Sequence, residues 1–468
     1  MVFSSISFIY YFLPIVLLLY FISPMPKGRI SVRNMVLLIA SMAFYYWGGY
    51  DYFYLIVLQI LSGWGFGLLI CRWRGTVKAR IPLIMCIIIG LSALMFYKYA
   101  DFFLGNVNLF TGSDMPLLKL ALPIGISFYT FQVISYAVDI YKGKIEAQKN
   151  PLTFATYTMF FPQLIAGPIV RYADVEQYYS GPRKHTWDDF SCGARRFVLG
   201  LSKKVLIANT LGELISILKA GNENSVFIYW LIIAACALQV YYDFSGYSDM
   251  AIGLGRIFGF KFLENFNYPF IAKSITDFWR RWHISLSYWF RDYVYIPMGG
   301  NRKRPVLNIL FVWFLTGFWH GAGWNFIAWG MYFAGALLFE KYVLRKLLEK
   351  FPAVIRHIYL LIVILISWNF FDSAGVGEAM TRIGGMLGIG TDSLAGSLSL
   401  YYLRSYAVLL LAAIIGATPI PKRLAEWVGT KKPQVLTILE PVGVALCLIT
   451  VTAFLADGSF NPFIYFRF

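Results

Sequence analysis

The chain has 468 residues, of which 59% are hydrophobic and only 14% are charged. A soluble globular domain carries about 25% charged residues, so this chain lacks the charge needed to cover a surface that faces water. These proportions argue against a disordered, collagen-like, coiled-coil or soluble multidomain protein and predict one polytopic membrane domain instead.

The charge is strongly unbalanced, with 41 Lys and Arg residues against 24 Asp and Glu residues and a net charge of +17. Such an excess occurs in nucleic-acid-binding proteins, but in a membrane protein it is expected in the cytoplasmic loops, beside the anionic leaflet. We therefore expect a lipid membrane, and no nucleic acid, as a partner. The five cysteines include no C-x-x-C pair, so the sequence predicts neither a metal site nor a disulfide framework.

The first apolar run, 6–23, follows no basic segment and ends at Pro24-Met25-Pro26-Lys27, which lacks the small residues of a signal-peptide cleavage site. We therefore expect a retained membrane span. Each helix that crosses a bilayer core about 30 Å thick needs about 20 apolar residues. By this measure the candidate spans in chain order are 6–23, 35–48, 52–70, 81–99, 117–140, 197–217, 226–244, 305–320, 323–340, 355–371, 403–418 and 434–455.

The apolar segment 152–170 is interrupted by Phe161-Pro162 and by Gly167-Pro168, so we expect it to be re-entrant. If it does not cross, every loop rich in Lys or Arg falls on one side of the membrane. The loops 100–116 and 372–402, which are nearly free of Lys and Arg, then fall on the other side. Because basic loops stay in the cytoplasm, both termini are predicted to be extracytoplasmic.

Residues 245–304 differ from the rest of the chain, because they mix charged and aromatic residues and contain no full span. Apolar residues recur there with helical spacing, at Ile275, Phe278, Trp282, Leu286 and Trp289. The pattern predicts amphipathic helices that either lie at the cytoplasmic interface or pack into the bundle.

Only four histidines occur, and their surroundings differ. His185 lies in a basic polar loop and is expected to be solvated, and His357 follows a basic residue at the start of a span and is expected to be interfacial. His283 is surrounded by tryptophans and arginines, and His320 ends an uncharged apolar run that glycines follow. An ionisable residue at membrane depth is costly, so we interpret His283 and His320 as functional; the alternative is a neutral histidine hydrogen-bonded between helices.

A helix that begins after the basic cluster Arg302-Lys303-Arg304 would carry His320 about 23 Å into the membrane. A buried neutral imidazole can act as a general base towards an alcohol, taking its proton as the oxygen attacks. This chemistry suits acyl transfer from a thioester to a hydroxyl group. The motifs of nucleotide-binding, serine-hydrolase and zinc-hydrolase sites are missing from the sequence.

Several long blocks of the sequence are recognisable. They are 122–132, 161–169, 242–251, 279–301 and 319–321, together with the opening Met-Val-Phe-Ser-Ser. In these blocks the chain resembles the membrane-bound O-acyltransferase family, and within it the alginate O-acetyltransferase-like bacterial branch. The likeness runs to about residue 340 and returns at the extreme C-terminus.

The resemblance implies an all-α polytopic membrane protein with about eleven transmembrane helices, plus re-entrant and amphipathic helices. It implies one domain over 1–468, with a catalytic core at about 117–340, C-terminal helices at 355–455 and an extracytoplasmic aromatic tail at 456–468. The key histidine of the family falls on His320, which would be the base. The second falls on His283, which would orient the donor carbonyl or stabilise the developing oxyanion. The resemblance implies no permanently bound cofactor and acetyl-CoA as the acyl donor.

The matching blocks supply further candidates that line the path of the acyl donor. They are Trp279, Arg280, Trp282, Ser285, Trp319, Asp249 and Asn301. In the tail, Tyr465 is a candidate carrier that receives the acyl group and passes it to an extracytoplasmic partner, because a phenol of pKa about 10 leaves more readily than an aliphatic alcohol. The alternative is that this aromatic tail anchors the chain at the membrane interface.

The leading hypothesis is an enzyme of the bacterial cytoplasmic membrane that moves an acetyl group from cytoplasmic acetyl-CoA to hydroxyls of an exported polysaccharide. The transfer would be direct or pass through an extracytoplasmic acetyltransferase partner. One alternative is D-alanyl transfer to teichoic acid from a carrier-protein thioester. Another alternative is a transporter. The interrupted segment 152–170 favours it, but buried acidic residues are sparse and the sequence shows no inverted repeat.

Overall fold

The computed structural model describes residues 2–24, 32–165, 167–181 and 183–457. These ranges are predominantly helical and hold no β-strand; a single isolated bridge joins Ser225 and Ser393. The all-α fold class is therefore confirmed. The chain divides into two compact units, the first comprising 1–197 and 248–263 and the second 198–247 and 264–468.

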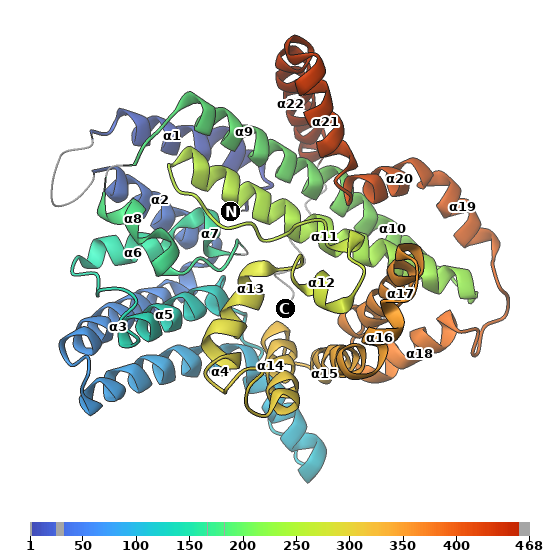
Figure 1. The fold of residues 1–468 in the computed structure, drawn as a ribbon, viewed down its shortest axis with the longest axis horizontal. Helices are drawn as coiled ribbons and strands as arrows, with labels where there is room; N and C mark the ends of the chain where they lie inside the picture. Colours follow the sequence, from blue (N-terminus) through green and yellow to red (C-terminus); the bar gives the residue numbers. More distant parts are fainter. Residues whose placement is uncertain (1, 25–31, 166, 182, 458–468) are drawn as a thin grey trace. The chain divides into compact units, whose positions relative to one another are not determined.

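The first unit holds the N-terminal helices, which Figure 1 draws from blue to green. They are α1 (Leu13–Ile22), α2 (Val32–Gly49), α3 (Phe53–Arg72), α4 (Arg80–Thr111), α5 (Ile126–Tyr141), α6 (Pro151–Met159), α7 (Phe161–Leu164), α8 (Tyr172–Ser180) and most of α9 (Trp187–Ser202). Helix α5 is almost wholly buried, and α3 packs closely against it at Gly63 and Gly67. A β-carbon at Gly63 would lie 2.7 Å from Val133, so only glycine permits this approach.

Helix α4 continues to Thr111, beyond the predicted end of its span at residue 99, and α5 begins at Ile126 rather than at 117. A side chain of α4 accounts for the later start of α5. The carboxylate of Asp101 accepts hydrogen bonds from the backbone N–H groups of Leu118, at 2.7 Å, and Lys119, at 2.8 Å. These bonds hold the returning segment in an extended path beside the helix, so its apolar residues do not form the start of α5.

The segment 152–170 is broken, as the sequence predicts. Helices α6 and α7 are separated at Phe160, whose φ of −51° and ψ of 107° are not helical. Pro162 stands in the first turn of α7, where its missing N–H costs nothing. The freed N–H of Phe161 donates to the hydroxyl oxygen of Ser41 at 3.1 Å. The break is therefore satisfied by protein, which is the condition for such a break at membrane depth.

The second unit contains the remaining helices. After a π-helical turn at Lys203–Ala208 they are α10 (Asn209–Ala220), α11 (Val226–Ile257, whose last residues belong to the first unit), α12 (Ile275–Trp279), α13 (Ile284–Phe290), α14 (Pro305–His320), α15 (Trp324–Phe339), α16 (Arg345–Leu348), α17 (Ala353–Asp372), α18 (Val376–Met386), α19 (Ser397–Ser405), α20 (Ala407–Gly416), α21 (Ile420–Lys431) and α22 (Pro433–Ala456). Helices α14 and α15 lie side by side, and α21 and α22 form a hairpin (Figure 1).

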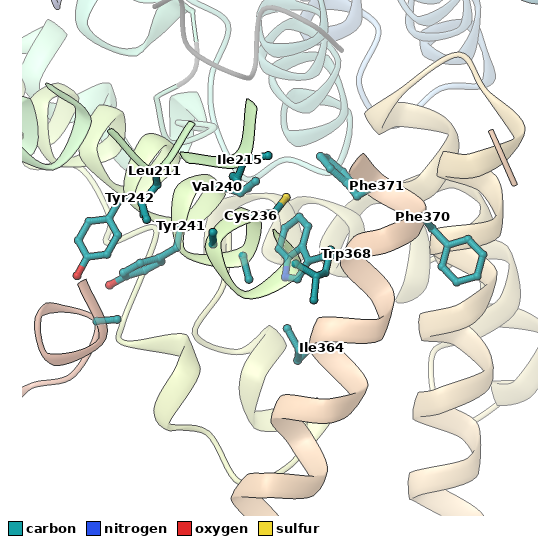
Figure 2. Packing of buried hydrophobic residues seen from close by; sticks show 14 of the residues in the cluster. Leu211, Ile215, Cys236, Val240, Tyr241, Tyr242, Ile364, Trp368, Phe370 and Phe371 are labelled. Carbon is teal, nitrogen blue, oxygen red and sulfur yellow. The ribbon is translucent and has the colours of Figure 1, made fainter. Parts of the chain in front are cut away.

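The core of the second unit is built largely from α10, α11, α15 and α17. Figure 2 shows Trp368 of α17 directed towards α11, beside Cys236. Burial of such large apolar side chains supplies most of the packing energy, at about 25 cal/mol for each Å² removed from solvent. The five apolar residues with helical spacing in 275–289 are all buried, so this segment packs into the bundle rather than lying at an interface.

Helix α11 extends thirteen residues past the predicted end of its span at 244, to Ile257. Charged residues near position 244 indicate that the helix ends there, but in the structure these residues form ion pairs. Asp243 lies 2.5 Å from the ammonium group of Lys204, and both side chains are buried. Asp249 lies 2.8 Å from the guanidinium group of Arg196. A paired charge can be buried at far lower cost than a lone one, so the helix continues through these positions.

Five helical segments of the described residues are long and apolar enough to cross a membrane, or six if the bent pair α19–α20 forms one span. The five are Val32–Arg72, Val77–Thr111, Val226–Ile257, Ala353–Asp372 and Pro433–Ala456. The chain is thus all-helical with several apolar helices, whereas about eleven transmembrane helices remain a prediction.

The short helix α12 is held by a carboxylate from a distant part of the chain. Glu340 follows α15 and is buried, and its oxygens accept the backbone N–H groups of Ile275, at 2.7 Å, and Thr276, at 3.2 Å. The hydroxyl of Thr276 donates to the same carboxylate at 3.1 Å. These are N–H groups at the start of α12, which no helical carbonyl can satisfy. Glu340 therefore fixes the segment that leads to His283.

We expect Glu340→Ala to lower the free energy of unfolding by about 1–3 kcal/mol, because it leaves buried N–H groups without an acceptor. Thermal unfolding of the purified protein in detergent would measure the loss. Glu349→Ala is the matched control, because Glu349 pairs with Arg345 at an exposed position. An exposed pair contributes at most about 1 kcal/mol. Equal stability of the two variants would contradict the role given to Glu340.

Candidate active site

Two glycines bring α14 and α15 into close contact. A β-carbon at Gly330 would clash with the carbonyl oxygen of Trp313 and lie 3.1 Å from the α-carbon of Gly317. A β-carbon at Gly317 would in turn clash with the carbonyl oxygen of Phe326. Because no side chain separates the two backbones here, the residues that follow Gly317 are held tightly against α15.

His320 is the last residue of α14 and is buried. The sequence predicts a helix from the basic cluster Arg302-Lys303-Arg304 to His320, and α14 confirms it. Three aromatic rings surround the imidazole: its centroid lies 5.0 Å from Trp319, 5.0 Å from Trp329 and 5.5 Å from Phe371. Gly321 follows in an extended conformation, where a β-carbon would clash with the ring of Phe326.

His283 joins α12 to α13 and is buried. Its φ of +43° and ψ of 54° place it in the left-handed region, which a residue with a β-carbon rarely adopts. Such a conformation costs about 1–3 kcal/mol and persists only where the surroundings impose it. The ring of Phe244 stands perpendicular to the imidazole, with centroids 4.6 Å apart. The segment 275–289 is therefore two helices with a turn at His283, and not one continuous helix.

Asn265 holds the turn in place. Its side-chain oxygen lies 3.2 Å from Nδ1 of His283 and accepts hydrogen bonds from the backbone N–H and the hydroxyl of Ser285, at 3.2 and 2.9 Å. Its backbone carbonyl accepts from the N–H of Ile284 at 3.0 Å. One buried amide thus satisfies the first groups of α13 and contacts the imidazole.

The structure brings His283 and His320 to the same aromatic cluster. The ring of Trp319 lies 6.2 Å from that of His283 and 5.0 Å from that of His320. His283 lies outside the candidate membrane spans, and burial lowers the pKa of its imidazole well below the usual value, with His320 acting in the same direction. A neutral imidazole in a water-poor pocket can accept a proton or a hydrogen bond from a hydroxyl group.

Four further predicted residues fall in or next to this aromatic cluster. The ring of Trp279 lies 5.7 Å from that of Trp329, and Trp282 packs 5.4 Å from Trp368. The ring of Trp319 lies next to both histidine rings, and Ser285 donates to Asn265, which contacts His283. That these four residues line a path for an acyl donor stays a prediction.

The other predicted site residues lie elsewhere. Arg280 is exposed. Asn301 is exposed and accepts from the hydroxyl of Tyr295, at 2.9 Å, and from Lys341, at 3.0 Å. Asp249 belongs to the first unit, where it pairs with Arg196. Tyr465 lies outside the described residues.

The two remaining histidines have structural contacts. His185 was expected to be solvated but is half-buried, with Nε2 3.3 Å from the hydroxyl of Tyr20. Burial lowers the pKa of its imidazole, and the cations Arg33 and Arg183 lower it further. His357 is half-buried, with Nδ1 3.0 Å from the carbonyl oxygen of Ala272.

Sequence reasoning missed four residues of the site: Asn265, Phe244, Trp329 and Phe371. Asn265 gives no motif signal; it stands between Glu264 and Phe266, ahead of the 279–301 block. The three aromatic residues lie on helices other than those that carry the histidines, and any apolar span contains such residues. The described residues hold no cluster of His, Cys, Asp and Glu that could bind a metal ion.

Comparison with known proteins agrees with this chemistry. Residues 146–372 match the model of the family described as MBOAT, membrane-bound O-acyltransferase. Over its full length and that of the relative, the chain is 35% identical to the probable alginate O-acetylase AlgI of Azotobacter vinelandii. The chain belongs to the membrane-bound O-acyltransferase family. The resemblance noted in the sequence is thus confirmed, and the protein is a multi-pass membrane O-acyltransferase.

Two further relatives mark the range of the family. The chain is 35% identical to the peptidoglycan O-acetyltransferase of Helicobacter pylori, over 84% of this chain and 81% of the relative. It is 31% identical to the teichoic acid D-alanyltransferase of Bacillus subtilis, over 45% of this chain and 57% of the relative. The match to O-acetyltransferases therefore covers far more of this O-acyltransferase than the match to the D-alanyltransferase.

The contact between α14 and α15 can be tested with alanine. Gly330→Ala places a β-carbon against the backbone of α14, and we expect it to destabilise the protein by about 1–3 kcal/mol and to displace His320. Gly335→Ala on the same helix is the matched control, because its β-carbon meets no atom within 4 Å. Thermal unfolding and acyl-transfer rates would be measured for both variants. Full activity of Gly330→Ala would show that the contact does not position His320.

Proposed function

We propose that this O-acyltransferase moves an acetyl group from cytoplasmic acetyl-CoA to hydroxyl groups of an exported cell-surface polysaccharide. The transfer is direct or passes through an extracytoplasmic acetyltransferase partner. The observation that carries the proposal is the buried pair His283 and His320, held at one aromatic cluster. The names of the alginate and peptidoglycan relatives support a sugar polymer as acceptor and acetyl as the group transferred.

The proposed setting is the bacterial cytoplasmic membrane, with about eleven transmembrane helices in a single domain. Basic loops face the cytoplasm, and both termini are extracytoplasmic. The catalytic core covers about 117–340, followed by C-terminal helices at 355–455 and an outward tail at 456–468. This orientation would place the donor on the inner side and the polymer on the outer side of the histidine pair.

In the proposed reaction His320 is the general base. Its imidazole accepts the hydroxyl proton while the hydroxyl oxygen attacks the carbonyl carbon of the thioester. A carbon–oxygen bond forms, the carbon–sulfur bond breaks, and the proton then passes to the departing thiolate, which leaves as the thiol of CoA. The pair needs no permanently bound cofactor for this step. Trp279, Trp282, Ser285 and Trp319 would line the donor path.

Two other functions are less well supported. D-alanyl transfer would use the same histidines, but the teichoic acid relative matches less than half of this chain. A transporter would not require two imidazoles at one aromatic cluster, and membership of an acyltransferase family argues for chemistry. Acetyl transfer is therefore the better supported reaction, and acetyl-CoA is the first acyl donor to test.

We expect His320→Ala to reduce acetyl transfer from radiolabelled acetyl-CoA by at least about 100-fold, because the hydroxyl loses its proton acceptor. The assay would use purified protein in lipid vesicles with alginate or peptidoglycan fragments as acceptors. His357→Gln is the control, because His357 contacts only the backbone of Ala272 among the contacts described. Wild-type activity in the His320 variant would overturn the catalytic proposal.

The outward tail gives a separate expectation. If Tyr465 carries the acyl group, Tyr465→Phe abolishes acetylation of the polymer in cells but leaves hydrolysis of acetyl-CoA by the purified protein intact. The phenyl ring of the variant keeps the apolar character of the tail, so an anchoring role would survive the change. Polymer acetylation at the wild-type level would refute the carrier role and favour the anchor.

A further inference from the structure

The hydrogen bonds around Asn265 fix which atoms of the site can donate and which can accept. Its side-chain oxygen receives the backbone N–H of Ser285 at 3.2 Å. A backbone N–H can only donate, so the atom that it meets must be the amide oxygen and not the amide nitrogen. The hydroxyl of Ser285, at 2.9 Å, agrees with this assignment. The orientation of the Asn265 amide is therefore determined.

The same oxygen lies 3.2 Å from Nδ1 of His283. An amide oxygen has no proton to give, so Nδ1 must carry the hydrogen of this bond. A neutral imidazole has one N–H, and burial together with the nearby His320 holds His283 in the neutral form. The other ring nitrogen, Nε2, is then an unprotonated hydrogen-bond acceptor.

Nε2 of His283 is buried and has no hydrogen-bond partner among the described residues. A buried acceptor without a donor carries the full cost of its lost hydration. The ring cannot easily turn to relieve this cost, because Phe244 packs across it and Asn265 holds the opposite edge. The site therefore keeps one acceptor in a fixed direction.

We propose that Asn265 is a positioning residue that fixes His283 as a hydrogen-bond acceptor for substrate. Nε2 accepts from an O–H or N–H donor, supplied either by a hydroxyl of the acyl acceptor or by an amide of the pantetheine arm of the acyl donor. In this form His283 cannot donate to the thioester carbonyl or to the oxyanion. The proposal rests on the acyl-transfer function and replaces the oxyanion role that the resemblance implies for this histidine.

The aromatic cluster contains other hydrogen-bond donors. The indole N–H groups of Trp279, Trp329 and Trp368 are buried and have no acceptor within the described part of the chain. Trp329 lies directly against His320, with ring centroids 5.0 Å apart. The cluster thus holds N–H donors other than His283, and Trp329 is the one that lies against His320.

The variant Asn265→Asp distinguishes an acceptor role of His283 from a donor role, because the two roles predict opposite changes of activity with pH. The aspartate keeps an acceptor oxygen for Ser285, but its charge raises the pKa of His283, because a nearby carboxylate favours the imidazolium form. Once protonated, Nε2 becomes a donor. If His283 acts as an acceptor, the activity of the variant relative to wild type falls at least about tenfold as the pH drops from 8.5 to 6. If His283 acts as a donor, the relative activity rises on the same change.

The ratio to wild type removes from the comparison those effects of pH that the two proteins share. Asn150→Asp is the matched control. The side-chain oxygen of Asn150 also accepts backbone N–H groups, from Leu152 at 2.9 Å and Thr153 at 3.4 Å, but in the first unit. We expect its pH profile to match wild type. Thermal unfolding confirms that both variants fold.

Nitrogen-15 spectra of histidine-labelled protein give a readout that does not depend on activity. The chain has only four histidines, and loss of one signal pair in His283→Gln assigns this residue. The proposal requires a protonated Nδ1 and an unprotonated Nε2 in wild type. A protonated Nε2 would overturn it, even if no acyl transfer were detected and the proposed function itself failed.

The kinetics of His283→Phe show which substrate donates the hydrogen bond to Nε2. This variant keeps a ring at position 283 but removes the hydrogen-bond acceptor. A rise of KM for acetyl-CoA alone identifies the amide of the donor arm. A rise of KM for the acceptor alone identifies a hydroxyl of the acyl acceptor. Both results support the proposal, whereas unchanged KM and kcat for both substrates would overturn it.

Discussion

Burial of two imidazole rings among indole and phenyl rings is the constraint on which the rest of this site depends. Burial lowers the pKa of the His283 imidazole well below its usual value, so the neutral form of this ring is favoured. Neutral imidazoles can move a proton without first releasing one to water. The apolar setting therefore decides the kind of chemistry that is possible, and membership of an O-acyltransferase family agrees with it.

Three features hold the pair in place. His283 has a left-handed backbone, α12 is capped by the buried carboxylate of Glu340, and α14 meets α15 at glycine with no side chain between them. The left-handed backbone would be avoided in a segment chosen for stability alone, whereas the cap and the glycine contact stabilise the helices that carry the two rings. Together they set the position and direction of two rings to the precision that proton transfer requires.

The sequence predicts much of this architecture, but not its fine geometry. The all-α membrane class, His320 at the end of its helix, and the break near Phe160 follow from composition, charge and proline. The extension of α11 does not, because charged residues in it have partners, such as Arg196 for Asp249, that only folding brings together. The role of Asn265 could not be predicted for the same reason. A single asparagine forms no sequence pattern, and its role depends on the contacts of its side-chain oxygen with Ser285 and His283 in the folded chain.

The most direct test is an experimental structure of the full chain in lipid with a hydrolysis-resistant thioether analogue of acetyl-CoA. The account predicts that the carbon corresponding to the thioester carbonyl lies within about 4 Å of a ring nitrogen of His320, with the analogue reaching it from the cytoplasmic side. An analogue bound away from both imidazoles, or rings closed off from both aqueous compartments, would contradict it.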